Sequence, residues 1–255
     1  MVNRFSMQGE VSFCYTLHWD EITMTRPQTK GKEATEVASV EKFAAGAVCN
    51  QLRHNLREIE HSSNLDIDPE RREQDYVLSP DRGISDYDYF KERIGQLYVY
   101  GRDDVKVMAG WVVTAPQNLS PERYDDFFCT TYDFLESRYG KENVIQAVVH
   151  NDEGGQPHLH FCFIPVVEDK KHEQGEKVCA NEVLDRHELR NFHPDLQKYL
   201  DAHGLEDARI MSGITKRQGG NRTVDELKGE REVEYEAPHQ SLYFGESRDD
   251  GHLYF

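Results

Sequence analysis

Two apolar segments joined by a polar loop rich in histidine constrain the fold more than any other feature of the sequence. The segments are "NVIQAVVH" (143–150) and "HLHFCFIPVV" (158–167), and both are rich in the β-branched and aromatic residues that favour strands. The loop between them has seven residues, among them Gly154, Gly155 and Pro157. The pattern predicts two antiparallel strands joined as a hairpin, with histidines at its mouth.

Further segments predict that strands and helices surround this hairpin. "VKVMAGWVVTA" (105–115) is typical of a central strand. The stretches 120–140 and 185–204 have the capping residues and the apolar spacing of helices, and shorter helices are expected within 43–58 and 85–100. Because the hairpin joins neighbouring strands without a crossover helix, we expect an α/β fold of the α+β kind. Its central sheet should be mainly antiparallel and flanked by helices.

The chain divides into three regions of different character. Residues 1–35 are expected to form a leader and linker, residues 36–228 a catalytic domain, and residues 229–255 an acidic, mobile tail. No run approaches the roughly 18 apolar residues of a membrane span, and no signal-peptide pattern opens the chain. The five cysteines are widely spaced and form no CxxC pair, which indicates free thiols in a reducing compartment. We therefore expect a cytoplasmic protein.

The charge of the chain limits its partners. The formal net charge is −17, which argues against a general coat for nucleic acid, because such coats depend on clustered Lys and Arg. It leaves room for a local basic groove or for a metal ion that binds phosphate.

The hairpin also predicts a metal site on one face of the sheet. Side chains alternate along a strand, so His158 and His160 project from the same face, and His150 ends the neighbouring strand. Three converging imidazoles leave coordination positions open for water or substrate, and such sites suit Zn, Mn, Fe or Ni. Asp152 and Glu153 are expected to orient a histidine N–H or to accept a proton. The alternative is a hairpin whose histidines lie at a solvated end of the sheet.

A second polar cluster precedes the hairpin, in "RHNLREIEHSSNLDIDPERREQDY" (53–76). By itself this mixed-charge stretch is typical of an exposed helix and loop.

Together the two clusters resemble those of the Mob/Pre (MobV-type) plasmid mobilisation relaxases, which belong to the HUH endonuclease group. The resemblance rests on "RHNLRE" (HNxR), on "HSSNLDIDPERREQDYVL" and on the hairpin, and it covers about residues 36–228. One departure is clear. The family usually has HxDExxPHxH, whereas "HNDEGGQPHLH" (150–160) carries one extra residue in the loop.

The resemblance implies a role for each matched residue. It assigns the metal to the three hairpin histidines, with Glu153 as a catalytic group beside it. His54 would be the nucleophile in place of the tyrosine that most relaxases use, and Arg57 would help to hold the phosphate. Tyr76 is the rival nucleophile, ranked behind His54.

The remaining expectations concern the surroundings of the site and its partners. Asp152 and Asn55 are expected to orient the metal-binding and catalytic groups. The metal would be a divalent ion, Mn²⁺ first, with Mg²⁺ or Zn²⁺ as alternatives. The candidate phosphate contacts are Arg53, Arg71, Arg72, Lys216, Arg217 and Arg222.

The function implied is metal-dependent, site- and strand-specific DNA nicking, through a covalent protein–DNA intermediate, to start the transfer or recombination of a plasmid or mobile element. The DNA partner would be an origin of transfer, as a single strand with a flanking duplex or hairpin. A second copy of the chain or proteins of a transfer machinery are further candidate partners. Two alternatives remain open: an inactive DNA-binding accessory protein with the same fold, and a metallohydrolase of small phosphorylated substrates.

Overall fold

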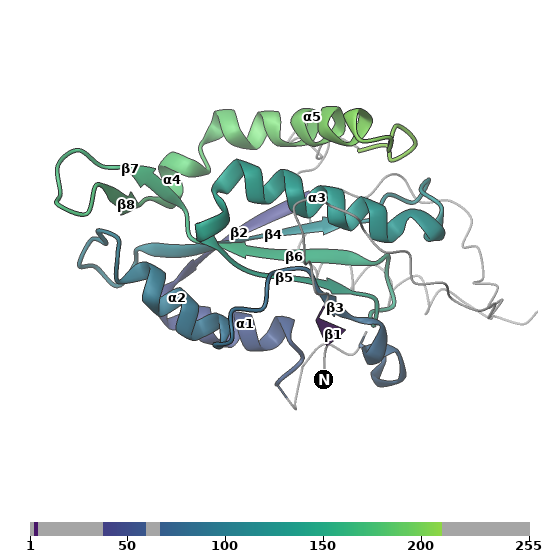
Figure 1. Ribbon diagram of the computed structural model, residues 1–255, viewed down its shortest axis with the longest axis horizontal. Coiled ribbons are helices and arrows are strands. Elements are labelled where there is room, and N and C mark those ends of the chain that lie inside the picture. The colour runs from purple at the N-terminus through teal and green to yellow at the C-terminus, as the bar shows by residue number, and fades with distance from the viewer. Residues whose placement is uncertain (1–2, 5–37, 60–66, 211–255) are drawn as a thin grey trace, which may run out of the picture. The chain divides into compact units, whose positions relative to one another are not determined.

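The computed structural model describes residues 3–4, 38–59 and 67–210 of the chain (Figure 1). The candidate phosphate contacts Lys216, Arg217 and Arg222 lie outside these ranges, as do the tail 229–255 and nearly all of the leader, so those expectations stay predictions. In the described ranges, no helix combines the length and the apolar character needed to cross a membrane.

A six-stranded sheet forms the centre of the fold, in the order β1-β3-β5-β6-β4-β2. Its strands are β1 (Asn3–Arg4), β2 (Ala38–Ala44), β3 (Tyr76–Val77), β4 (Lys106–Thr114), β5 (Val144–His150) and β6 (His158–Phe163). The pair β1–β3 is parallel and all other pairs are antiparallel, which confirms the mainly antiparallel sheet. The hairpin β5–β6 is present with its loop at 151–157, as expected.

The second strand of the hairpin is shorter than the sequence predicts. It ends at Phe163 instead of 167, and Pro165, which has no N–H to donate to a ladder, follows two residues later. The chain then enters a separate two-stranded sheet, formed by β7 (Val166–Glu168) and β8 (Glu176–Val178).

Helices cover both faces of the central sheet (Figure 1). One face carries α1 (Ala45–Asn55) and α2 (Asp86–Ile94), and the other carries α3 (Tyr124–Tyr139) and α5 (Arg186–Ala202). The shorter elements are α4 (Ala180–Val183) and the 3-10 helices η1 (Pro69–Gln74), η2 (Pro121–Arg123) and η3 (Lys141–Asn143). The helices expected within 43–58, 85–100, 120–140 and 185–204 are therefore all present.

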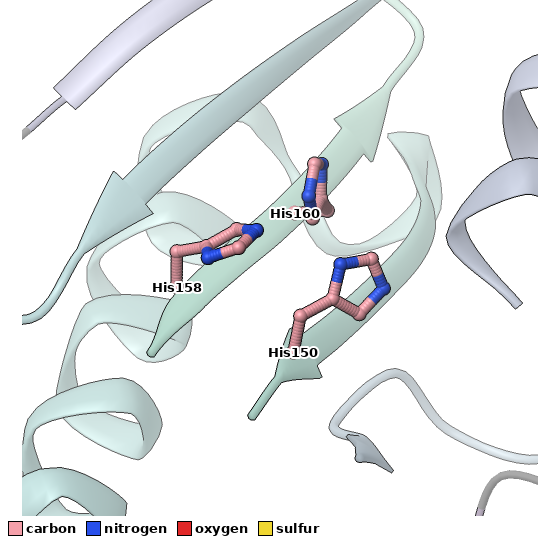
Figure 2. A group of neighbouring side chains, drawn as sticks. All are labelled: His150, His158 and His160. Carbon is pink, nitrogen blue, oxygen red and sulfur yellow. The ribbon is translucent and has the colours of Figure 1, made fainter. Parts of the chain in front are cut away.

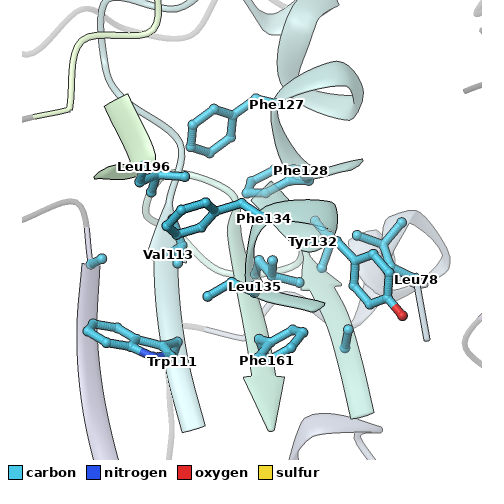
Figure 3. Close-up of a cluster of buried hydrophobic side chains, with 14 of the residues drawn as sticks. Leu78, Trp111, Val113, Phe127, Phe128, Tyr132, Phe134, Leu135, Phe161 and Leu196 are labelled. Atoms are coloured by element: carbon cyan, nitrogen blue, oxygen red, sulfur yellow. The ribbon is translucent and has the colours of Figure 1, made fainter. Parts of the chain in front are cut away.

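The face under α3 and α5 holds the larger apolar core (Figure 3). The indole of Trp111 on β4 stacks on the ring of Phe192 on α5, with 3.6 Å between ring centroids. Phe161 on β6 lies edge-on to Tyr132 of α3, with centroids 6.0 Å apart. These large rings, buried together, supply much of the hydrophobic free energy of folding.

Strand β6 contributes side chains to both faces of the sheet. Its residues Leu159, Phe161 and Phe163 belong to the core under α3 and α5, whereas Cys162 packs with Val48 and Leu52 of α1. Since side chains alternate along a strand, the two histidines of β6 share the face of Cys162. The histidines therefore point toward the side of the sheet that α1 covers.

Candidate metal centre and nucleophile

The three hairpin histidines converge, as the sequence predicts (Figure 2). His150 on β5 is the direct cross-strand partner of His158 on β6, and His160 follows two residues later on the same face. The ring centroids lie 4.5 Å (His150–His160), 4.9 Å (His158–His160) and 5.4 Å (His150–His158) apart. One nitrogen of each ring lies within 4.8 Å of the others, so a single ion could bind all three.

Hydrogen bonds fix which nitrogen of two rings is free. His150 Nε2 lies 2.7 Å from the carbonyl oxygen of Asn55, and His158 Nδ1 lies 3.2 Å from that of Gln156. A carbonyl only accepts, so these nitrogens must carry the proton and the opposite nitrogens carry a lone pair. The free nitrogen of His150, Nδ1, is buried and has no partner within the described part of the chain. A buried imidazole lone pair left in this way fits a divalent metal ion.

The surroundings of His150 and His160 favour the neutral form of these two rings. Burial lowers the pKa of His150 well below its usual value, and the nearby guanidinium of Arg57 lowers it further. Burial likewise lowers the pKa of His160, followed by the influence of His150 and His158. Neutral imidazoles are the form that binds metals.

The end of α1 brings the second cluster to the same place. The N–H of Arg57 donates to the carbonyl of His54 at 3.0 Å and so closes the last turn. Arg57 has a φ of 56°, in the left-handed region that side chains other than glycine rarely adopt. This turn directs the chain back toward the hairpin loop, so His54 and Arg57 lie on the histidine face.

His54 is half-buried, and its surroundings favour the neutral ring. Burial lowers the pKa of His54, and the adjacent Arg57 lowers it further, against the opposing influence of Glu153 and Asp152. His54 in turn contributes to the lowered pKa of His150. A neutral imidazole with a free lone pair is a competent nucleophile near neutral pH.

The guanidinium of Arg57 joins the two clusters. Its Nε donates to Asp152 at 2.9 Å, and its Nη2 donates to Asp152 at 2.5 Å and to Glu153 at 2.9 Å. Although burial opposes it, these hydrogen bonds raise the pKa of Arg57. Its remaining nitrogen, Nη1, is buried and has no hydrogen-bond partner among the described residues. The extra loop residue therefore does not prevent Asp152 and Glu153 from reaching the site.

Asn55 lies beneath this network and is fully buried. Besides accepting from His150 through its carbonyl, its amide nitrogen donates to Gln146 of β5 at 2.9 Å. Asn55 therefore connects α1 to β5 directly under the histidines, where the sequence placed an orienting residue.

Arg71 and Arg72, expected as phosphate contacts, have internal partners. Arg71 donates to the backbone carbonyls of Asn151 and Glu153, and Arg72 Nη2 donates to the carbonyl of Arg57 at 2.8 Å. Arg53 differs from them. Its side chain is 56% exposed and lies 3.7 Å from the carboxylate of Glu58. Of the three arginines, Arg53 is thus the one displayed to solvent.

Tyr76, the rival nucleophile, lies on the opposite face of the sheet. It pairs with Val149, a residue of the core under α3 and α5, and it packs against that core itself. Its hydroxyl donates to Asp125 of α3 at 2.8 Å. Residues directly opposite in a ladder share a face, so the sheet separates Tyr76 from the histidines.

Asp75 is the residue of this site that the sequence reasoning missed. It is fully buried, and its carboxylate accepts from the backbone N–H groups of Asn151 and Asp152. Burial raises its pKa to about 7, with a further contribution from the neighbouring Asp152. The strand that follows Asp75 has only two residues, too few for a periodic pattern to indicate where its side chain points.

Residues 32–226 match the family model described as Mob_Pre, plasmid recombination enzyme. The chain belongs to this family. A plasmid recombination enzyme of Streptococcus agalactiae is 31% identical over 200 residues, which cover 75% of this chain and 38% of the relative. A type 1 enzyme of Staphylococcus aureus is 32% identical over 184 residues, which cover 69% of this chain and 44% of the relative. The chain thus spans less than half of the length of these two Mob_Pre relatives.

Solved structures agree with the family and with the fold. The chain is similar to a MobM relaxase domain (MOBV; Mob_Pre), with 29% identity and a TM-score of 0.63 over 76% of this chain and 97% of that one. That crystal structure is manganese-bound and contains plasmid pMV158 oriT DNA. The similarity confirms the resemblance to MobV-type relaxases and the expected fold class.

Proposed function

We propose that this chain is a metal-dependent relaxase that nicks one strand of DNA at a specific origin of transfer and stays covalently attached to it. The observation that carries the proposal is the convergence of His54, Arg57 and the three hairpin histidines on one face of the sheet. Two further findings support it: the Mob_Pre family, and the similarity to a relaxase domain solved with manganese and oriT DNA. The catalytic domain would span residues 36–228.

The hairpin histidines would hold a divalent ion, with Mn²⁺ first and Mg²⁺ or Zn²⁺ as alternatives. The free, buried Nδ1 of His150 supports this assignment. When bound, such an ion stabilises the negative charge that develops on a phosphate. The carbonyls of Asn55 and Gln156 fix two of the rings, so the donor nitrogens are oriented before any ion arrives.

His54 would be the nucleophile. Its unprotonated ring nitrogen attacks the phosphorus, so an N–P bond forms while the bond from phosphorus to the 3′ oxygen breaks. The 3′ oxygen takes up a proton and becomes a free 3′-OH, and the other ring nitrogen of His54 gives up its proton. The 5′ side of the nick remains attached as a phosphoramidate, which a 3′-OH can later attack to rejoin the strand. The lowered pKa of His54 favours the attacking form.

Arg57 would hold the phosphate with the N–H groups of Nη1. Asp152 and Glu153 accept from Nε and Nη2 and so fix the plane of the guanidinium. That leaves one buried donor nitrogen for a ligand oxygen. Glu153 also has an oxygen 3.9 Å from His158 Nε2, which puts a carboxylate beside the proposed metal.

DNA would be the partner, as an origin in single-stranded form with a flanking duplex or hairpin. Arg53, exposed on the helix that carries His54, is our first candidate phosphate contact. Lys216, Arg217 and Arg222 remain further candidates. A local contact set of this kind is compatible with the net charge of −17, because phosphate contacts act at short range in salt.

The test uses the full chain, Mn²⁺ and a supercoiled plasmid that carries the region upstream of the chain's own gene. We expect relaxed plasmid and protein-linked DNA, both lost when EDTA removes the metal. In the His54→Ala variant, adduct formation should fall by about 10³-fold or more, because the nucleophile is gone. Tyr76→Phe is the matched control. It also removes a candidate nucleophile, but from the opposite face, and should retain adduct formation.

The chemistry of the link gives an independent check. A phosphoramidate hydrolyses in mild acid, whereas a tyrosine phosphodiester survives it. An acid-stable adduct that Tyr76→Phe abolishes would overturn the assignment of His54. DNA binding without relaxation of any origin-bearing plasmid would favour the accessory-protein alternative. Turnover of small phosphorylated substrates alone would favour the metallohydrolase.

A further inference from the structure

Asp75 lies between the loop that follows His150 and the side chain of Arg57. It follows η1 and precedes β3, and it is 0% exposed. Its Oδ1 accepts from the N–H of Asn151 at 2.6 Å and from that of Asp152 at 3.1 Å. These are the first two amides after His150, where β5 ends and the loop begins.

The segment around Asp75 holds the backbone of this loop at several points. Arg71 donates to the carbonyls of Asn151 and Glu153, and the N–H of Asp68 donates to the carbonyl of Asp152 at 2.7 Å. The segment also accepts from the loop: the Gln74 carbonyl accepts from the side chain of Asn151 at 2.7 Å, and Asp75 accepts from the two backbone N–H groups that lie nearest to His150.

The path of the loop decides where the chemistry sits. Asp152 and Glu153 reach Arg57 only because the chain turns sharply after His150. Loss of the acceptor would leave two amides, one of them on a fully buried residue, without a partner. The loop would then shift to find other acceptors. His150 would shift with it, as would the carboxylates of Asp152 and Glu153 that accept from Arg57.

We propose that Asp75 is a positioning residue, which acts by accepting hydrogen bonds from the backbone N–H groups of Asn151 and Asp152. These hydrogen bonds set the position of His150 for metal binding and the orientation of Arg57. The inference rests on the proposed function, since it concerns the same site. The hydrogen bonds that Asp75 accepts come from the loop backbone, while its Oδ2 lies 3.8 Å from Arg57 Nε, so the test must separate the loop contact from the charge beside Arg57.

The geometry favours the acceptor role over a role as counter-charge. The other oxygen, Oδ2, lies 3.8 Å from Arg57 Nε and accepts no hydrogen bond, whereas Arg57 already has two carboxylate partners. A neutral group with one well-placed oxygen would therefore do the same work. The raised pKa of Asp75 agrees with this, because burial disfavours its charged form.

The experiment compares Asp75→Asn with Asp75→Ala in the full chain. Asparagine keeps an oxygen acceptor and removes the charge, whereas alanine removes both. The matched control is Asp185→Ala, which also removes a carboxylate that accepts from two backbone N–H groups, those of His187 and Glu188, both at 2.8 Å. That pair caps α5, on the other face of the sheet.

Three quantities are measured: the Kd for Mn²⁺ by electron paramagnetic resonance, kcat and KM for adduct formation, and the melting temperature. Asp75→Ala should weaken Mn²⁺ binding and lower kcat, each by roughly 10- to 100-fold, with KM for DNA little changed. Asp75→Asn should restore both to within about threefold of wild type, on the scale of one retained hydrogen bond. Asp185→Ala should lower the melting temperature and leave the Mn²⁺ Kd and kcat as they were.

Two results would overturn the inference. One is an Asp75→Asn variant that is folded but as impaired as alanine, which would make the charge essential. The other is a folded Asp75→Ala variant with the Mn²⁺ Kd and kcat of wild type. If Asp75→Ala fails to fold, Asp75→Asn still decides. If wild type binds Mn²⁺ but nicks nothing, the proposed function fails, while the Mn²⁺ titrations still test Asp75.

Discussion

The two faces of the central sheet differ in chemical character, although the same strands form both. Under α3 and α5, aromatic rings such as Trp111 and Phe192 stack in a buried apolar core. Under α1, the end of the sheet carries histidines, an arginine and buried carboxylates, joined by hydrogen bonds. Strand β6 contributes to both, with His160 on one face and Phe161 on the other.

The difference shows where the stability of the site comes from. The polar face gathers groups that are costly to bury, and four buried polar atoms around the site have no hydrogen-bond partner in the described part of the chain: Arg57 Nη1, Arg72 Nε, His150 Nδ1 and Asp75 Oδ2. A smaller apolar cluster, which includes Val48 and Leu52 of α1, also lies on this face. The two apolar clusters fix the strands, and the strands then hold the polar groups in place.

The sharpest way to break this comparison is to remove one side chain from each face at neighbouring positions. His160→Ala should reduce adduct formation by about 10³-fold, because a metal contributes several kcal/mol of charge stabilisation and this change removes one of three ligands. The melting temperature of the metal-free protein should hardly move. Mn²⁺ titration and thermal unfolding measure the two effects. A large loss of stability without added metal would mean that the histidine face also carries the fold.

Phe161→Ala is the reciprocal change. Phe161 is fully buried and packs near the rings of Tyr132 and Tyr139, so its loss should lower the free energy of unfolding by about 3–5 kcal/mol. Urea denaturation gives this value. The protein that remains folded at low temperature should bind Mn²⁺ with nearly the affinity of wild type. If Mn²⁺ affinity collapses in the folded variant, the two faces are coupled through β6 and the division between them is wrong.

pH sharpens the comparison further, since His54, the proposed nucleophile, lies on the polar face and has a shifted pKa. The pKa of His54 is lowered below 6.5, so the neutral, attacking form predominates above that value. The rate of adduct formation should therefore be constant at higher pH. It should fall about tenfold per pH unit once the pH drops below the lowered pKa. The rate is measured at saturating Mn²⁺ with metal occupancy followed in parallel, since His150 and His160 also bind metal only when neutral. A rate that keeps falling above pH 6.5 would contradict the lowered pKa.

How much of the fold and of the site the sequence could predict depends on how far apart the contacting residues lie in the chain. The apolar, β-branched and aromatic residues of 143–150 and 158–167, with a polar loop between them, predicted the hairpin, and period two put His158 and His160 on one face, as the structure confirms. The apolar spacing of 120–140 predicted α3, because burial of one helix face depends mainly on local pattern. Such features depend on residues close together in the chain.

What the sequence could not predict depends on contacts between distant segments. Asp75 acts on amides 76 and 77 residues away, and no local pattern marks such a contact. The motif around Tyr76 suggested a rival nucleophile. Its pairing with Val149 puts its side chain on the opposite face of the sheet, and such a register cannot be predicted from one strand alone. Arg71 and Arg72 were expected to contact phosphate, but Arg71 donates a hydrogen bond to a carbonyl of the loop and Arg72 donates one to the carbonyl of Arg57, just after α1.

The arginines provide the smallest and most discriminating effect. Arg53→Ala should weaken DNA binding a few-fold and reduce by about 1 the slope of log K against log salt, as expected for one lost phosphate contact. Arg72→Ala removes a hydrogen bond to the backbone of Arg57, a residue with a strained φ of 56°. It should leave the slope unchanged and lower kcat instead, because Arg57 loses its orientation. Filter binding at several salt concentrations, with single-turnover nicking, separates the two. Equal slopes for Arg53→Ala and wild type would remove Arg53 from the DNA contacts, and a reduced slope for Arg72→Ala would return Arg72 to them.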